Sequence, residues 1–186
     1  MREGRRQGAG LRFLTRIARA VITAAGLIAF LGLQPKSARL AGAEAARGTV
    51  AGTLMLSDQA RRYLTLQYRS YPTEFMGCMI GEARGSAVVV RRIAPADVDP
   101  SQSALTHVRP MASCEEAGWS GTVGIIHSHP GGQHCSYYFP GTMVLSSDGQ
   151  SFVRQPYPVD AIMCGDRVVW ISRGMMEGQL DLAAAR

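Results

Sequence analysis

The sequence predicts an α/β fold in which a mixed β-sheet is flanked by helices. Three observations predict it: a segment with helical spacing near residue 60, two β-branched runs after it, and an apolar run that ends in two histidines. The order of the expected elements is helix, strands, helix, strands. This order is typical of a sheet covered by helices, and no internal repeat is visible.

The first helix is expected to begin at Ser57-Asp58, an N-cap followed by an acid in the first turn. Ala60 and Leu64 recur at helical spacing after it. Pro72 forces the helix to end, because the residue before a proline disfavours the helical region.

Strands are expected where short apolar or β-branched runs are bounded by turn residues. Two of them, 75–80 and 87–93, are expected to pair, and 122–127 is a Val- and Ile-rich strand buried on both faces. The runs 161–164 and 167–172 flank Gly-Asp and predict a closing hairpin.

The remaining segments are expected to be irregular, apart from one short helix. The stretch 93–116 contains three prolines and is expected to be irregular or part of an edge strand. The stretch 130–147 is expected to be a loop, and 149–154 to form a helix whose N-terminus holds Asp148.

Residues 1–45 are predicted to be a signal peptide or an N-terminal membrane anchor with its linker, and 46–186 the functional domain. Six arginines precede the apolar stretch 20–33, and 41–43 offer an A-x-A-like cleavage site. The orientation rule would place the domain outside the cytoplasm, on the periplasmic side. If the segment is instead an over-extended start, the protein is cytoplasmic.

The net positive charge lies in the leader and the residues next to it. The formal net charge of the chain is +6, yet residues 1–47 carry +7 and the rest carry −1. A phosphate-binding surface needs a basic patch on the folded domain itself. We therefore expect no nucleic-acid partner, and membrane contact only through the N-terminal segment.

Four cysteines are spread along the chain without a C-x-x-C pair, which disfavours a clustered structural zinc site. An exported domain would permit two disulfides, with three possible pairings. Cys78 and Cys164 stand among apolar residues and are interpreted as small core residues, while Cys114 and Cys135 are left open.

The most informative pattern is His127 and His129 at the end of a strand, with Asp148 following across a Gly-rich loop. Side chains two residues apart on a strand point the same way, so both imidazoles can reach one metal ion. Two histidines, a carboxylate and an open position for water are typical of a catalytic zinc site. Glu74 is the candidate general base. Glu82, Glu115 and Glu116 compete with it on composition alone.

The chain resembles the JAB/MPN (JAMM) zinc metalloproteases, of the bacterial type, over about residues 54–173. The family pattern is E-x-x-G-x-L-x-G, then H-x-H-P, then S-x-x-D. Here the segment 74–81 matches the first element with Met79 in place of Leu, 127–130 matches the second, and Asp148 matches the third. Three elements in order are more specific than any one of them.

The resemblance implies a JAB/MPN (cytidine-deaminase-like) sandwich with one Zn²⁺ per chain. His127, His129 and Asp148 would be the metal ligands, and Glu74 would hold and deprotonate the catalytic water. The serine of the family helps to stabilise the oxyanion, a contribution of a few kcal/mol in such sites.

The family serine has no direct counterpart, because Leu145 stands three residues before Asp148. Eighteen residues separate His129 from Asp148, where the usual pattern leaves ten. Ser146 is preferred narrowly over Ser147 as the substitute. His134 is an alternative third ligand, and His107 is expected at the surface. Residues 137–139 are aromatic and suit either loop packing or a gate beside the metal.

Two functions of different class follow. The first is a zinc metallopeptidase or isopeptidase that hydrolyses an amide bond of a protein or peptide substrate, or of a small amide or cell-wall peptide. The second is a non-catalytic JAB/MPN scaffold that binds proteins. Desolvating four convergent polar groups is costly, which disfavours the scaffold. The sequence leaves the oligomeric state open.

Overall fold

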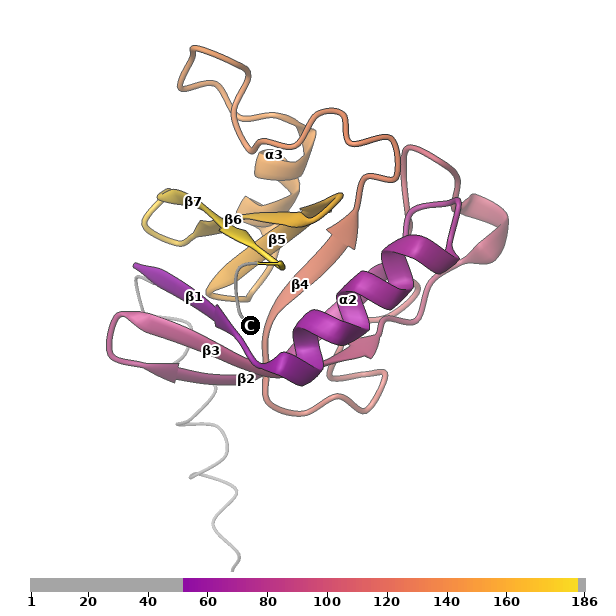
Figure 1. Cartoon of the computed structure of the whole chain (residues 1–186), viewed down its shortest axis with the longest axis horizontal. Coiled ribbons are helices and arrows are strands. Elements are labelled where there is room, and N and C mark those ends of the chain that lie inside the picture. The colour runs from indigo at the N-terminus through magenta and orange to yellow at the C-terminus, as the bar shows by residue number, and fades with distance from the viewer. Residues whose placement is uncertain (1–51, 184–186) are drawn as a thin grey trace, which may run out of the picture. The chain divides into compact units, whose positions relative to one another are not determined.

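The computed structural model describes residues 52–183, so the predicted leader, its cleavage site and the boundary at 45–46 lie outside the described residues. Within the described residues, seven strands form one sheet and two α-helices pack on it (Figure 1). The strands are β1 (Thr53–Leu56), β2 (Met76–Arg84), β3 (Ala87–Pro95), β4 (Thr122–Ser128), β5 (Val159–Cys164), β6 (Arg167–Ser172) and β7 (Glu177–Asp181). The predicted α/β fold with a mixed sheet is confirmed.

The sheet has the strand order β1-β3-β2-β4-β5-β6-β7. β1 pairs with β3 and β4 pairs with β5 in parallel, and the other neighbours are antiparallel. The parallel pair β4–β5 lies at the centre of the sheet, with His127 opposite Ile162. Consequently the last residues of β4 are held between β2 and β5.

The helix α2 (Asp58–Ser70) covers one face of the sheet (Figure 1). It begins as predicted, because the hydroxyl of Ser57 accepts a hydrogen bond of 3.2 Å from the amide of Ala60. Ala60 and Leu64 are fully buried in the main apolar core. The helix ends two residues before Pro72, as the proline requires.

The other face is covered by the shorter helix α3 (Ser147–Arg154) and the loop that precedes it. Every residue of β5 is buried, because the strand contributes to both faces. Ala161 and Met163 pack into the core beneath α2, whereas Ile162 and Cys164 pack against Phe152 of α3. The 3-10 helix Pro100–Gln102 lies in the long connection between β3 and β4.

Both cysteines interpreted as free core residues are in disulfides, so that interpretation is wrong about their oxidation state. Cys78 bonds to Cys114, and Cys135 bonds to Cys164. Cys78 and Cys164 are indeed buried. Burial among apolar residues suits a half-cystine as well as a thiol, so the sequence context did not separate the two.

The edge strands β1 and β7 were not predicted. Each is short, and their residues alternate between inside and outside without a β-branched run. In the described part of the chain, no helix is long and apolar enough to cross a membrane.

Candidate metal centre

The two histidines lie at the end of β4, where neighbouring strands fix the backbone. His127 pairs with Met76 of β2 and with Ile162 of β5. The amide of His129 donates a 2.9 Å hydrogen bond to the carbonyl of Met163. The centroids of the two imidazole rings are 5.1 Å apart. The side chains therefore meet on one side of the strand, as their spacing indicates.

Glu74 is brought to the histidines by Ser128, the residue between them. The hydroxyl of Ser128 accepts from the amide of Phe75, and its amide donates to the Phe75 carbonyl, both at 3.0 Å. The amide of Glu74 donates to the carbonyl of Ala104 at 3.1 Å. Glu74 is only 8% exposed, and its Oε1 lies 3.6 Å from Nε2 of His129.

Asp148 arrives from the first turn of α3, which the hydroxyl of Ser146 caps by accepting from the amide of Gly149 at 3.3 Å. Gly149 allows the preceding loop to lie directly on this turn. A Cβ at residue 149 would stand 2.5 Å from the carbonyl oxygen of Tyr137. The helix start therefore requires glycine here, and Ser146 is its N-cap, with Asp148 in the first turn.

The three ligand atoms of His127, His129 and Asp148 lie within 4.8 Å of one another. Nε2 of His127 is 3.7 Å from one carboxylate oxygen of Asp148, and Nε2 of His129 is 3.6 Å from the other. These separations are too long for hydrogen bonds. They are close to the roughly 3.3 Å between ligands that each lie about 2 Å from one tetrahedral metal ion. The donor set thus fits a metal.

The surroundings of the cluster raise the pKa of one carboxyl, that of Glu74, to near neutral pH. Burial raises the pKa of Glu74 to about 7, with His127 opposing and the charge of Asp148 adding to the rise. Burial also raises the pKa of Asp148, but His127 and His129 outweigh it and lower that pKa overall. Burial and the neighbouring His127 lower the pKa of His129, which keeps that imidazole neutral.

The cluster opens into a cavity of about 380 Å³. Its walls include Leu105 and Thr106 from the connection before β4, and Gln133 and His134 from the loop after it. A larger cavity of about 880 Å³ lies along the outer side of α2, between Arg61, Arg62 and Arg69, away from these residues.

A family model of prokaryotic homologs of the JAB domain matches residues 56–136. The matched segment holds Glu74, His127 and His129, and it ends before Asp148. The match covers less than half of the chain. It supports the assignment of the chain to the JAB/MPN family.

Among solved structures, the chain is similar to the solution structure of a protein from Desulfitobacterium hafniense. The two are 18% identical with a TM-score of 0.41, and the similarity covers 69% of this chain and 90% of that chain. No curated protein matches the chain.

Other predicted site residues lie in different surroundings. The hydroxyl of Ser146 donates to the carbonyl of Ser136 at 3.0 Å while it caps α3, and Ser147 is the serine that lines the cavity. The oxyanion role of Ser146 stays a prediction. His134 also lines the cavity, with a backbone φ of 56°.

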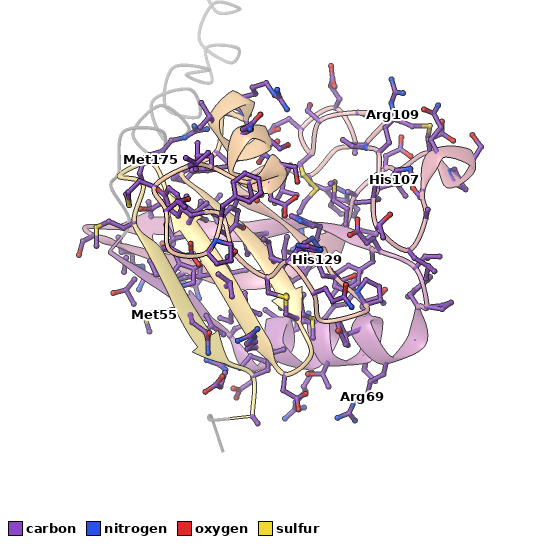
Figure 2. The ribbon with its side chains drawn as sticks, turned by 90° about the horizontal axis from the view of Figure 1, so that it is seen from above. Met55, Arg69, His107, Arg109, His129 and Met175 are labelled. Carbon is purple, nitrogen blue, oxygen red and sulfur yellow. A yellow bond between two sulfur atoms is a disulfide. The ribbon has the colours of Figure 1, made fainter. Side chains whose placement is uncertain are left out.

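His107 is exposed, as expected, and Figure 2 shows it apart from His129. The alternative bases also lie elsewhere. Glu82 is partly exposed and paired with Arg84 and Arg91. Glu115 accepts a hydrogen bond from Tyr157, and Glu116 accepts one from the amide of Ser113.

One polar residue behind the candidate metal cluster was missed. Asp160 is 1% exposed on β5, and Tyr137 donates a 3.0 Å hydrogen bond to one of its carboxylate oxygens. The other oxygen has no hydrogen-bond partner. Burial raises the pKa of Asp160 to about 7, and the charge of Asp160 helps to raise the pKa of His127 against the effect of burial. A single acid inside the apolar run of β5 was the available signal.

Tyr137 is fully buried, so its interpretation as a gate is wrong. Phe139 is half exposed, and the hydroxyl of Tyr138 donates to the carbonyl of Met175. Tyr137 and Tyr138 therefore attach this loop to the rest of the domain, and none of the three aromatic residues lines the cavity.

Proposed function

We propose that this chain is a zinc-dependent peptidase or isopeptidase that hydrolyses an amide bond with a metal-activated water. The observation that carries the proposal is the convergence of His127, His129 and Asp148 at ligand spacing beside the buried Glu74. Two histidines and a carboxylate leave a fourth tetrahedral position open, which is typical of catalytic rather than structural zinc. Bound zinc would supply a Lewis acid and lower the pKa of water toward 7.

Glu74 is the general base in this proposal. Burial raises its pKa to about 7 in the metal-free protein. A carboxyl whose pKa is near the working pH can accept a proton from water and return it to the leaving amine. Its position is fixed, because Ser128 holds the adjacent Phe75 against the end of β4. The cavity of about 380 Å³ admits a short peptide segment at the cluster. Ser147 lines that cavity and is a second candidate, beside Ser146, for the oxyanion partner.

The test is a comparison of Glu74→Gln with Glu82→Gln in the full chain. Glu82 is a partly exposed acid on β2, the strand that follows Glu74, and provides the matched control. We expect about one equivalent of zinc in all three proteins, and hydrolysis of a fluorogenic peptide-amide mixture reduced by roughly 10²–10⁴-fold in Glu74→Gln alone. Equal rates in Glu74→Gln and the parent protein would refute the role of Glu74.

The second candidate is a protein-binding scaffold of the JAB fold. It is favoured by Leu145 at the family serine position and by the capping bonds that occupy the hydroxyl of Ser146. Metal analysis separates the two functions. A folded protein that takes up no zinc supports the scaffold and ends the enzyme proposal.

We further propose that the protein is exported or anchored on the periplasmic side and acts there on a protein, peptide or cell-wall peptide. The charge and apolar pattern of the leader supports export. Two disulfides in the domain also support an oxidising compartment, since disulfides persist there. Fractionation with an antibody against residues 46–186 tests this proposal, which fails if the protein is cytoplasmic.

A further inference from the structure

The two ring nitrogens of His129 face different surroundings. Nε2 faces Asp148 and Glu74, each at 3.6 Å. Nδ1 lies 2.9 Å from the backbone carbonyl oxygen of Gln133, which can only accept a hydrogen bond. Nδ1 must therefore carry the proton, and Nε2 is left with the lone pair that a metal needs. The carbonyl of Gln133 selects the ligating tautomer of His129.

The segment that carries Gln133 is attached at both ends and exposed between them. At its start, the hydroxyl of Tyr68 donates to the carbonyls of His129 and Pro130 at 2.9 and 3.1 Å. At its end, Cys135 is bonded to Cys164 on β5. Residues 131–134 are exposed, so the described residues offer them little packing.

The disulfide is the covalent attachment nearest to the Gln133 carbonyl. Sγ of Cys135 lies 3.4 Å from that oxygen. Cys164 is 5% exposed and packs in the core with Ile162 and Phe152. The bond therefore connects the carbonyl that orients His129 to the rigid centre of the sheet.

We propose that the Cys135–Cys164 disulfide is a redox-dependent support of the metal centre, which holds the Gln133 carbonyl against Nδ1 of His129. This inference rests on the proposed metal-binding function. Reduction by a dithiol breaks the sulfur–sulfur bond, delivers two electrons and two protons to form two thiols, and leaves the reductant as a disulfide. The Gln133 segment is then released, and His129 loses the partner that selects its tautomer.

The expected consequence is weaker metal binding. Loss of an outer partner of a ligating histidine commonly lowers metal affinity 10–100-fold. Cys135 and Cys164 act through Gln133 and His129, so they are positioning residues. The protein would hold its metal in an oxidising compartment and release it more readily in a reducing one.

The first experiment compares two disulfide-free variants of the full chain, Cys135→Ser/Cys164→Ser and the control Cys78→Ser/Cys114→Ser. The control removes a bond of similar sequence separation, 36 against 29 residues, that does not reach Gln133. Zinc affinity is measured by competition with a chromophoric chelator. We expect a 10–100-fold loss in the first variant and less than a threefold change in the control. Equal affinities in the two variants overturn the proposal.

The second experiment reads the tautomer of His129 directly in zinc-free wild-type protein, by the ¹⁵N chemical shifts of its imidazole. We expect the Nδ1–H form in the oxidised protein and a mixture of tautomers after anaerobic reduction with dithiothreitol. An unchanged tautomer after reduction overturns the proposal, even if the serine variants do not fold.

The two experiments also separate this inference from the proposed function. If oxidised wild-type protein binds no zinc, the proposed function fails. If it binds zinc and the two serine variants bind it with equal affinity, only this inference fails. The reduced thiols lie near His129, with all three ligand atoms within 4.8 Å. Reduced protein loaded with Co²⁺ in place of zinc tests whether these thiols bind the metal themselves. A sulfur-to-cobalt charge-transfer band, together with a metal affinity as high as that of the oxidised protein, would show that they do and would also contradict the proposal.

Discussion

The two long loops beside the candidate site are attached to the sheet in the same way but in different surroundings. The first spans 96–121, between β3 and β4, and the second spans 129–146, between β4 and α3. Each is joined to a strand by one disulfide. In each, a tyrosine–carboxylate hydrogen bond lies within two residues of a half-cystine, 2.6 Å long at Tyr157–Glu115 and 3.0 Å long at Tyr137–Asp160.

The difference lies in the burial of the carboxylate. Glu115 is exposed and stays hydrated, whereas Asp160 is 1% exposed and has one oxygen without a partner. The first loop contributes cavity walls such as Leu105, and the second begins with His129 and leads into the helix that holds Asp148. The second loop, which carries candidate ligands, is therefore attached through a carboxylate whose protonation changes with pH, and the first loop is not. Single substitutions can test this contrast.

The largest effect is expected from removing either disulfide. The sequence separations of 36 and 29 residues predict nearly equal losses, about 4 kcal/mol each in the free energy of unfolding, by the chain-entropy relation. Urea denaturation of the two double-serine variants measures both losses. If the two losses differ by more than about 1 kcal/mol, the two loops do not depend equally on their disulfides, and one is held much more by its other contacts.

The next effect concerns Asp160 and pH. Burial raises its pKa from 3.8 to about 7, so the folded state binds this proton more tightly than the unfolded state. Its contribution to stability is full below about pH 4 and is lost as the pH rises to 7. We expect Asp160→Asn to unfold less readily than wild type at pH 8, by at most about 4 kcal/mol, and to match it near pH 4.

Urea denaturation of metal-free protein from pH 4 to 8 measures this dependence, with Glu115→Gln as the exposed control. In wild type, the free energy of unfolding should fall as the pH rises. This slope should be shallower in Asp160→Asn but should not vanish, because burial also raises the pKa of Glu74 to about 7. A slope that stays as steep as in wild type would mean that Asp160 does not titrate in this range.

A smaller effect is expected from the two tyrosine hydroxyls. Tyr137→Phe leaves the buried carboxylate of Asp160 without its hydrogen bond, which costs about 2 kcal/mol at pH 8. Tyr157→Phe leaves Glu115 in water and should cost less than about 1 kcal/mol. Unfolding curves at pH 8 and pH 5 check both. The loss in Tyr137→Phe should shrink at pH 5, where Asp160 is protonated, and a loss independent of pH would contradict the contrast.

Local signals predicted the parts of this fold that local physics decides. Ser57 and Pro72 mark the ends of α2, and the spacing of His127 and His129 on a strand brings their rings together. The disulfides depend on proximity across 29 and 36 residues, which no local pattern encodes. Asp160 could have been noticed as an acid in an apolar strand, but its partner stands 23 residues earlier.

The smallest effect on stability is expected at the loop residues with positive φ. The first loop uses glycine there, with a φ of 89° at Gly118, whereas the second also uses His134 at 56°. Gly118→Ala should cost about 1 kcal/mol, because a side chain disfavours this region. His134→Gly should change stability by less than about 0.5 kcal/mol, since relief of strain and loss of chain stiffness nearly cancel.

A strained histidine on a cavity wall is instead expected to affect substrate binding. In the fluorogenic peptide assay, His134→Gly should raise KM several-fold and leave kcat unchanged, because the interaction would be equal in the ground and transition states. A fall in kcat at constant KM would place His134 in the chemical step. Gly118→Ala should change neither constant, because residue 118 does not line the cavity, and the two loops would then differ in function as they differ in the burial of their carboxylates.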